Sequence, residues 1–582
     1  MPYQITFPLG FAVLIASLFV FMVQLSLSVQ AGARRSVVVD KPPAAKGRTL
    51  ILLDVNTKNP IRTVSENFLS LQLDPSIIHD GWLDFLSSKR LVTLARGLAP
   101  AFLRFGGKRT DFLQFQNLKN LAKSRGGPGP DYYLKNYEDD IIRSDISLDK
   151  QKGCNIAQHP GTMLELQREK AAQMHLVLLK EQFSNTYSNL TLTARSLDKL
   201  YNFVDCSGLH LIFGLNALRR KPDNTWNSSN VLSLLKYSAS KKYNISWELG
   251  NEPNNYRALN GRTVNGSQLG KDYVQLRSML QSIRTYSRAS LYGPNIGRPR
   301  KNVIVLLDGF MKVAGNTVDA ITWQHYYIDG RVAKVMDFMK TRLLDTLSDQ
   351  IGKIQKVVNT YTPGKKIWLG GVGTAWARGT NNLSDTYAAG FLWLNTLGMS
   401  ANQGIHVVIR HSFFAHGYNH LVDQNFNPLP DYWLSLLYKQ LVGPKVLAIH
   451  VAGLQRKPRP GRVIRDKLRI YAHCTSYKNI NYVRGSITLY IINLHRSRKK
   501  IKLTGALRDK IVHQYLLQPF GSEGLQSKSV QLNGQPLVMV DDGTLPELKP
   551  RALRPGRTLV IPPLTIGFYV IKNVNAVACR YR

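Results

Sequence analysis

Acidic side chains are scarce in this sequence. Its 582 residues include 37 Asp and Glu but 77 Lys and Arg, which gives a formal net charge of +40. A field of this sign and size attracts polyanions such as nucleic acids, anionic membranes or sulfated glycans. The hydrophobic fraction of 44% is ordinary for a globular protein. A chain of this length can therefore bury a large core and form more than one domain.

Charged residues are absent from residues 1–33, and Leu9–Leu27 is mostly apolar. Small residues at 29–31 or 31–33 offer a cleavage site, so we expect residues 1–33 to be a secretory signal peptide. The alternative is a signal anchor, because the apolar run is long enough to span a bilayer. After cleavage we expect no membrane span, and we expect the protein in the extracellular matrix or at the cell surface.

Cysteine is also rare, and its placement agrees with export. Cys154 and Cys206 lie in one region, and Cys474 and Cys579 lie in the last fifth or so of the chain. Of three possible connectivities, pairing within each region is the simplest, and four free thiols are the alternative. Asn-X-Ser/Thr sites for N-glycosylation occur at Asn189, Asn227, Asn244, Asn265 and Asn382. An exported protein does not meet nucleic acid, so sulfated glycans become the favoured polyanion.

No glycine-rich phosphate loop follows the first predicted strand, and the chain has no internal repeat. Short apolar runs, typical of buried parallel strands, alternate with helical stretches. This alternation predicts an α/β fold with a (β/α)8 TIM-type barrel, and an open doubly wound sheet is the alternative. The eight runs are Phe68–Asp74, Ala101–Gly107, Leu209–Leu215, Ile245–Gly250, Ser290–Pro294, Ala320–His325, Lys366–Gly370 and His406–His411.

The predicted barrel occupies residues 61–433, with an inserted linker at about 112–158. Residues 434–582 contain short strand-like runs divided by Gly, Pro and Asn, which predicts a β-sandwich domain. In the N-terminal segment, residues 34–60, the run Leu50–Val55 is a strand that could join this sandwich.

The candidate catalytic residue is Glu252, in the stretch Trp247–Asn255. Pro253 ends the regular structure, so Glu252 lies at the end of a predicted barrel strand beside Asn251. A carboxyl group next to an amide at this place suits the general acid/base of a glycosidase. For a lone Asn-Glu-Pro a simple turn acid is the favoured interpretation, so the rest of the chain has to decide.

With these features, the chain resembles the heparanase family, which consists of secreted glycoside hydrolases acting on heparan sulfate. The resemblance covers nearly the whole chain after residue 33. Its motifs are Thr93-Leu-Ala-Arg-Gly-Leu98, Leu103-Arg-Phe-Gly-Gly107, Cys206-Ser-Gly-Leu209, Trp247–Asn254, Asn265-Gly-Ser-Gln-Leu-Gly270, Tyr292-Gly-Pro294, Trp323-Gln-His-Tyr-Tyr327 and Asp431-Tyr-Trp-Leu-Ser-Leu436. Lys108-Arg109, Arg298–Asn302 and the insertion are similar to a non-hydrolysing branch of the family.

The resemblance implies a barrel whose C-terminal sandwich takes an N-terminal strand, and a retaining mechanism with Glu252 as acid/base and Asn251 beside it. It also places His325 and Tyr327 near the substrate cleft and Asp74 on the substrate side of the first strand. Heparan sulfate and heparin are the implied ligands, and we expect no cofactor and no metal.

The second carboxylate of a retaining glycosidase is missing. In the family, a Glu follows Trp-Leu-Gly after the seventh strand, but here Gly371 follows Trp368-Leu-Gly370. Residues 350–384 contain no Asp or Glu, so a shift of register cannot supply one. Losing a covalent nucleophile removes about 4–8 kcal/mol of transition-state stabilisation. Without a like charge nearby, we expect Glu252 to be ionised at neutral pH. Trp376-Ala-Arg378 replaces the family's Tyr-Gly-Gly loop, which predicts a narrower cleft.

Basic residues follow two of the predicted strands. Arg298, Arg300 and Lys301 come after the fifth strand, and Arg219 and Arg220 come after the third. Guanidinium groups bind sulfate bidentately, so we interpret these residues as substrate-binding, with a solvated basic loop as the alternative. In the sandwich, residues 456–469 and 496–502 are basic clusters that could form a second glycan site or simply a solvated face.

Three functions remain open at this stage. The first is a secreted heparan-sulfate-binding homologue without useful hydrolase activity, which competes for the glycan with active heparanase or with other heparan-sulfate-binding proteins such as growth factors. The second is an active endo-β-glucuronidase with an unexpected nucleophile. The third is a protein-interaction module of the extracellular matrix.

Overall fold

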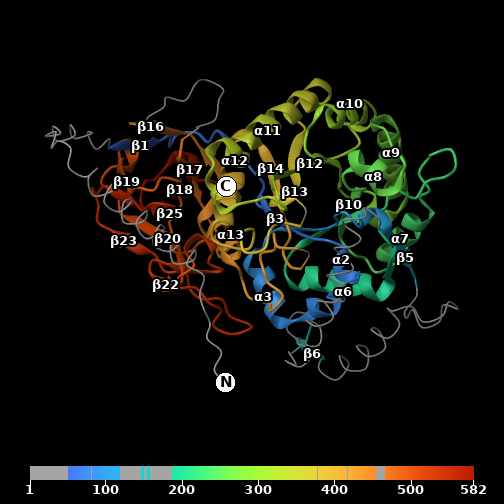
Figure 1. The fold of residues 1–582 in the computed structure, drawn as a ribbon, viewed down its shortest axis with the longest axis horizontal. Coiled ribbons are helices and arrows are strands. Elements are labelled where there is room, and N and C mark those ends of the chain that lie inside the picture. Colours follow the sequence, from blue (N-terminus) through green and yellow to red (C-terminus); the bar gives the residue numbers. More distant parts are fainter. Residues whose placement is uncertain are drawn as a thin grey trace, which may run out of the picture. The chain divides into compact units, whose positions relative to one another are not determined.

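The fold was examined in a computed structural model, which describes residues 50–79, 82–117, 146–149, 154–157, 187–376, 378–415, 417–453 and 466–581. The predicted barrel is confirmed: eight parallel strands close in the order β10-β11-β12-β13-β14-β3-β4-β9, with helices outside (Figure 1). The strands are β3 Leu69–Leu73, β4 Phe102–Phe105, β9 His210–Leu215, β10 Ile245–Leu249, β11 Leu291–Ile296, β12 Ala320–Asp329, β13 Lys366–Trp376 and β14 Ile405–His411.

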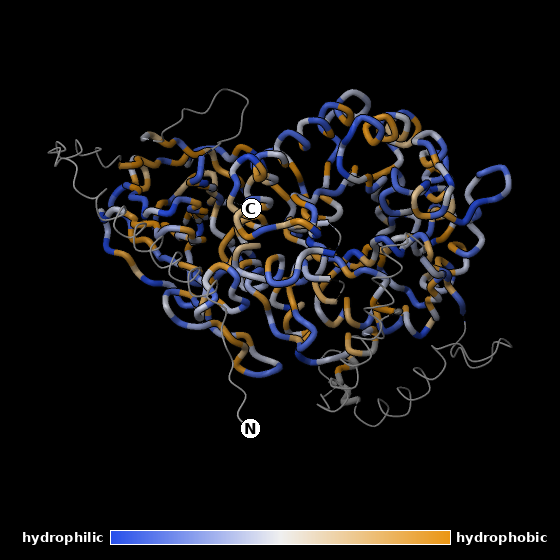
Figure 2. The backbone as a smooth tube through the Cα atoms, viewed as in Figure 1, coloured by the Kyte–Doolittle hydropathy of each residue, from blue (hydrophilic) through white to orange (hydrophobic). Residues whose placement is uncertain are grey.

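These strands are buried on both faces, which explains their nearly continuous apolar character. Every residue of β3 and β10, for example, is buried. The larger surrounding helices are α3 Lys89–Gly97, α6 Ala194–Cys206, α7 Ser229–Ser240, α9 Gly266–Ser282, α10 Lys301–Ala314, α11 Thr341–Tyr361, α12 Ala389–Gln403 and α13 Pro430–Leu441. Hydrophobic residues recur along the barrel strands and helices, separated by polar residues (Figure 2). Both β12 and β13 are longer than the sequence predicted, reaching Asp329 and Trp376.

The C-terminal region consists of two sheets, as predicted. The larger sheet has the order β2-β15-β17-β18-β25-β20-β21-β22, with β23 beside β20. Its strands are β2 Arg62–Thr63, β15 Val442–Leu447, β17 Leu468–Thr475, β18 Ile487–Asn493, β25 Thr565–Ile571, β20 Val512–Phe520, β21 Ser529–Leu532, β22 Gln535–Pro536 and β23 Arg551–Leu553. The smaller sheet comprises β16 Ile449–Ala452, β1 Ile51–Val55, β19 Lys499–Leu503 and β24 Leu559–Ile561 in that order.

β1 is the strand found in Leu50–Val55, and it pairs antiparallel with β16 and parallel with β19. Apolar residues of the two sheets form one core, with Leu53 and Ile501 on one side and Leu489 on the other. The helix α12 is buried on all sides because it lies between the barrel and the larger sheet. Since α13 continues to Leu441, the sandwich strands begin later than residue 434.

The predicted insertion is only partly within the described residues. At its start, β5 Leu113–Gln116 pairs in parallel with β8 Leu190–Thr193. Two further strands, β6 Ile146–Asp149 and β7 Cys154–Ala157, pair antiparallel. The other insertion residues, the expected signal segment and the cluster at 456–465 lie outside the described residues.

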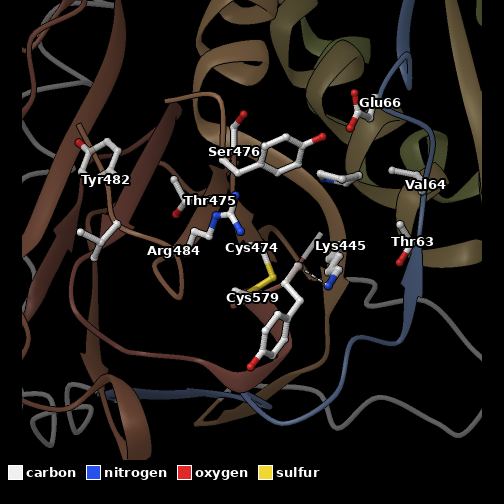
Figure 3. A pocket seen from close by; sticks show the side chains of 14 residues that line it. Thr63, Val64, Glu66, Lys445, Cys474, Thr475, Ser476, Tyr482, Arg484 and Cys579 are labelled. Atoms are coloured by element: carbon white, nitrogen blue, oxygen red, sulfur yellow. Dashed lines mark hydrogen bonds between the residues drawn. A yellow bond between two sulfur atoms is a disulfide. The ribbon is translucent and has the colours of Figure 1, made fainter. Parts of the chain in front are cut away.

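Both disulfides follow the simplest predicted connectivity. Cys154 is bonded to Cys206 at the end of α6, and Cys474 of β17 is bonded to Cys579 near the C-terminus. The second bond borders a hollow of about 150 Å³, where Lys445 donates to the Tyr581 carbonyl at 2.6 Å (Figure 3). The bond and this hydrogen bond hold the last residues of the chain against the larger sheet.

His473 in the larger sheet gives a pH prediction. Its ring nitrogens lie 2.8 Å from the Gly443 carbonyl and from the Tyr490 hydroxyl, and burial lowers its pKa to about 4. Because the unfolded state binds the proton more tightly, His473 destabilises the fold increasingly as the pH falls below about 6.5. The free energy of unfolding of the wild type and of His473→Gln can be measured with urea at pH 7 and at pH 5. The difference between the two proteins, in favour of the wild type, should be about 1–2 kcal/mol smaller at pH 5 than at pH 7.

The exposed His450 supplies the matched control, because an exposed substitution such as His450→Gln should change the free energy of unfolding by no more than about 0.5 kcal/mol. An advantage over His473→Gln that stays constant between the two pH values would contradict the prediction.

Candidate functional site

A cavity of about 300 Å³ lies at the carboxyl ends of the barrel strands. This is the end at which barrels of this kind carry their chemistry. The lining residues lie on or directly after seven of the eight strands: Gln72, Gly107, Lys108, Asn251, Glu252, Asn254, Asn255, Arg298, Arg300, Asn302, Val303, Gln324, Tyr326, Ala375, Trp376, Arg378, His411 and Asn419. Four of these residues are cationic, and Glu252 is the one carboxylic acid among them.

Glu252 lies directly after β10 with a left-handed backbone conformation, φ +44°. Its amide donates to the Asn295 carbonyl at 3.0 Å, which fixes the turn. A non-glycine residue in this region is strained, and such strain is common at functional sites. Burial raises the pKa of the Glu252 carboxyl, while Lys108 and Arg104 oppose the rise. Burial therefore outweighs the nearby positive charges, and the ionisation of Glu252 at neutral pH stays a prediction.

Behind Glu252, a buried ion pair braces the end of β10. Arg104 of β4 donates from Nε to Glu248 at 2.6 Å and from its terminal nitrogen to the Asn251 side-chain oxygen at 2.9 Å. Both charged side chains are fully buried. Glu248 is thus a core ion-pair partner.

Asp111 holds the same turn from another direction. One of its oxygens accepts from the Ala217 amide and the other from the Asn251 amide, both at 2.9 Å. Burial raises the pKa of Asp111 to about 7, against the opposing effect of these hydrogen bonds. Asn251 is therefore fixed through both its backbone and its side chain, which leaves Glu252 in a defined place at the cavity.

Gly371 lies on β13 opposite Gln324 of β12. A β-carbon at this glycine would lie 3.2 Å from the Gln324 carboxamide carbon and 3.2 Å from the Gln72 side-chain oxygen. Gln324 donates to the Asn251 side chain at 2.9 Å, and Gln72 donates to the Gly106 carbonyl at 2.8 Å. Two hydrogen-bonded amides therefore border the place where a retaining glycosidase needs its nucleophile, about 5–5.5 Å from the acid/base.

Arg298 is held in place at the cavity. When the Gln350 carboxamide is oriented to satisfy its neighbours, its oxygen accepts from Arg298 Nε at 2.8 Å and its nitrogen donates to His325 Nδ1 at 2.7 Å. Burial lowers the pKa of His325 to about 4, so its ring is neutral at pH 7. The buried histidine thus positions a cavity arginine through Gln350.

The structure brings some of the predicted site residues together and leaves others apart. Asn251, Glu252, Arg298 and Arg300 line the cavity, and Trp376 and Arg378 border it as expected. Asp74, at the end of β3, lies behind the lining with one carboxylate oxygen 3.9 Å from His411 Nε2.

The remaining predicted residues do not line the cavity. His325 and Tyr327 point away from it, and the Tyr327 hydroxyl lies 2.7 Å from Thr396 of α12. Arg220 forms a buried ion pair with Asp272 of α9 at 2.6 Å, which removes it from solvent. Arg219 and Lys301 are also outside the lining.

Sequence reasoning missed Lys108, Gln324, Tyr326 and His411 as cavity residues. Side chains of a strand alternate between its two faces. From the sequence we placed His325 and Tyr327 near the cleft, which assigned Gln324 and Tyr326 to the opposite face of β12. In the structure, Gln324 and Tyr326 are the residues that line the cavity. Glu252 was identified because it follows the end of a barrel strand. The same reasoning, applied to the ends of β4 and β14, would have identified Lys108 and His411.

Among the described residues, no group of three or more His, Cys, Asp or Glu side chains is arranged to hold a metal ion. The described helices also include none that is both long and apolar enough to cross a bilayer. Of the five N-glycosylation sequons, Asn189, Asn244, Asn265 and Asn382 are exposed and Asn227 is half-buried.

The barrel, its strand-end glutamate and the attached sandwich define a glycoside-hydrolase fold with one of its two carboxylates absent. A solved 4-O-alpha-L-rhamnosyl-beta-D-glucuronidase from Fusarium oxysporum shares this fold with a TM-score of 0.57 at 12% identity, covering 90% of this chain and 100% of that one. Residues 163–398 match the family model described as glycosyl hydrolase family 79, N-terminal domain.

The chain belongs to the heparanase family. It is 86% identical to "Inactive heparanase-2" of Homo sapiens, over 96% of this chain and 95% of that protein. It is 47% identical to "Heparanase" of Mus musculus, over 90% of this chain and 94% of that protein. The family resemblance based on the motifs is thereby confirmed.

Proposed function

We propose that this protein is a secreted heparanase homologue that binds heparan sulfate or heparin in the barrel cavity without cleaving it. The observation that carries the proposal is the composition of the cavity: its described lining residues include four cations and one carboxylic acid, with glycine at the nucleophile position. The name of the human relative, an inactive heparanase, supports the absence of hydrolysis.

Binding is supported by the cations around the cavity. Arg298 and Arg300 follow β11, Lys108 follows β4, and Arg378 follows β13. Guanidinium groups pair bidentately with sulfo and carboxylate groups, and Arg298 is already oriented by Gln350. A sulfated uronic-acid chain offers both kinds of group.

Hydrolysis by the retaining route requires a second carboxylate facing Glu252, and Gly371 supplies neither a nucleophile nor a charge. One observation favours residual activity: burial raises the pKa of Glu252, which suits a general acid. An endo-β-glucuronidase activity is therefore the alternative, and it would have to depend on Glu252.

A protein with these properties would modulate the availability of heparan sulfate. By occupying the glycan at the cell surface or in the matrix, it would compete with active heparanase or with other heparan-sulfate-binding proteins. The two disulfides and the exposed sequons support a secreted glycoprotein.

Heparin affinity tests the binding proposal. Arg298→Gln/Arg300→Gln is expected to weaken binding to immobilised heparin about 10-fold or more and to lower the salt concentration for elution, because fewer counterions are released. The control Arg284→Gln/Lys312→Gln removes two exposed charges from outside the cavity and should change affinity less than about threefold.

Equal heparin affinities of the two variants would show that the cavity does not bind the glycan. For hydrolysis, heparan sulfate incubated with the wild type should keep its chain length. Fragmentation that disappears in Glu252→Ala would instead establish the alternative function.

A further inference from the structure

The sandwich carries a second concentration of positive charge. A small hollow of about 20 Å³ lies where the end of β19, the segment before β20 and the connection from β23 to β24 meet. Five cations line it: Lys502, Arg508, Lys510, Arg554 and Arg557. None of these residues belongs to the barrel cavity.

Few acids surround this charge among the described residues. Asp509 is the one acid in their lining of the hollow, and it lies 3.5 Å from Arg508. Within the described part of the chain, Lys502, Lys510, Arg554 and Arg557 form no ion pair. Residues 496–510 and 549–557 together contain eleven Lys and Arg and the single acid Asp509. Several like charges around one hollow repel each other and attract an anion that can sit between them.

The loops that present these cations have defined conformations. Asp509 has φ +57° and Gly556 has φ +73°, and a β-carbon on Gly556 would lie 3.0 Å from the Asp509 carboxylate. The two loops therefore meet at Gly556, and each of them contributes cations to the lining of the hollow.

The basic surface continues toward the barrel. On β19, Lys500 and Lys502 are exposed and the intervening Ile501 is buried, so both lysines lie on the outer face. Before β19, a terminal guanidinium nitrogen of Arg496 contacts Met336 Sδ at 4.0 Å. Met336 belongs to the connection after β12, the strand that places Gln324 and Tyr326 in the cavity.

We propose that this hollow and the adjoining face of β19 form a second binding site for a sulfated polysaccharide, distinct from the barrel cavity. The inference deepens the proposed function, but it rests on its own residues. Exposed guanidiniums on two loops suit a sulfo group at the mouth of the hollow, and the lysines of β19 suit the following charges along a linear chain.

An anionic membrane is the competing ligand, because exposed apolar residues lie on the same sheet face. Leu52 is opposite Lys502 on the neighbouring strand, and Val560 is opposite Lys500. Five cations line the hollow, and among the described residues only two exposed apolar side chains lie beside the lysines of β19, which favours the polysaccharide.

The test compares three purified full-length proteins: the wild type, Lys502→Gln/Arg554→Gln/Arg557→Gln, and the charge-matched control Arg284→Gln/Lys312→Gln/Lys353→Gln, which removes exposed cations from around the barrel. The probes are heparin, unsulfated heparosan, and phosphatidylserine/phosphatidylcholine vesicles. The sandwich variant should bind heparin at least about 10-fold more weakly than the wild type at physiological salt. The slope of its log affinity against log salt should fall by about two or three.

The affinity of the control for heparin should fall by less than about threefold. Heparosan should bind weakly to all three proteins. Equal heparin affinities of the sandwich variant and the control would overturn the proposal, as would a loss seen only on vesicles. Failure of this proposal can be distinguished from failure of glycan binding in the barrel cavity, because Arg298→Gln/Arg300→Gln tests the cavity independently.

Discussion

Replacing Arg104 by Met is expected to lower the free energy of unfolding by about 3–5 kcal/mol. The change leaves Glu248 without its partner at 2.6 Å, and both side chains are fully buried. An uncompensated charge in this place costs more than the ion pair itself contributes. Denaturant unfolding followed by fluorescence measures the loss. The side-chain oxygen of Asn251 would also lose the hydrogen bond donated by Arg104. Because Asn251 lines the cavity, we expect weaker heparin binding even where the variant is folded.

Two further variants sharpen this prediction. Lys478→Met breaks the exposed pair between Lys478 and Glu66 and should cost no more than about 1 kcal/mol. The double variant Arg104→Met/Glu248→Leu removes both charges and should recover much of the loss. A loss below about 1 kcal/mol in Arg104→Met would show that the pair does not brace β10.

Gly371→Glu is expected not to restore hydrolysis of heparan sulfate. The new side chain would begin 3.2 Å from the amides of Gln324 and Gln72, which keep their own hydrogen bonds, and it would be displaced from the position that faces Glu252. A displacement of about 1 Å can cost about 100-fold in rate. We therefore expect turnover at least about 100-fold below that of an active heparanase, measured by the shortening of labelled chains.

The control Gly371→Gln adds the same bulk without a charge and separates crowding from chemistry. Gly371→Glu/Gln324→Ala opens the space and should be more active than the single variant. Rapid cleavage by Gly371→Glu alone, abolished by Glu252→Ala, would show that the remaining site is intact and that only the nucleophile is missing.

The barrel could be predicted from the sequence because each strand is buried on both faces and forms its own apolar run between helices. The lengths of the strands were harder to predict from the sequence. β12 continues through partly buried residues to Asp329, and β13 continues through the buried run Gly371–Ala375 to Trp376, which pairs in register with Asp329. The end of β12 resembles a loop in sequence because polar and aromatic side chains collect there, and the glycines at the end of β13 are disfavoured in strands.

The candidate site was predictable only in part, because long-range contacts decide which strand-end residues reach the cavity. Glu252 and Arg298 follow from the positions of β10 and β11. Nothing near Arg220 in the sequence indicates that Asp272, on the later helix α9, removes it from solvent. Nor does the sequence show that His325 positions Arg298 through Gln350, since all three lie on different elements.

The pairing of β1 with β19 has a consequence for how the chain is made. Leu53 and Thr504, which are hydrogen-bonded at the end of this pair, are separated by 451 residues. At about 5–20 residues per second, a ribosome completes the partner strand about 20–90 s after it has made β1. During this time the apolar side of β1 and its unpaired edges are available to other chains. The nascent polypeptide must therefore be protected from aggregation until β19 has been made.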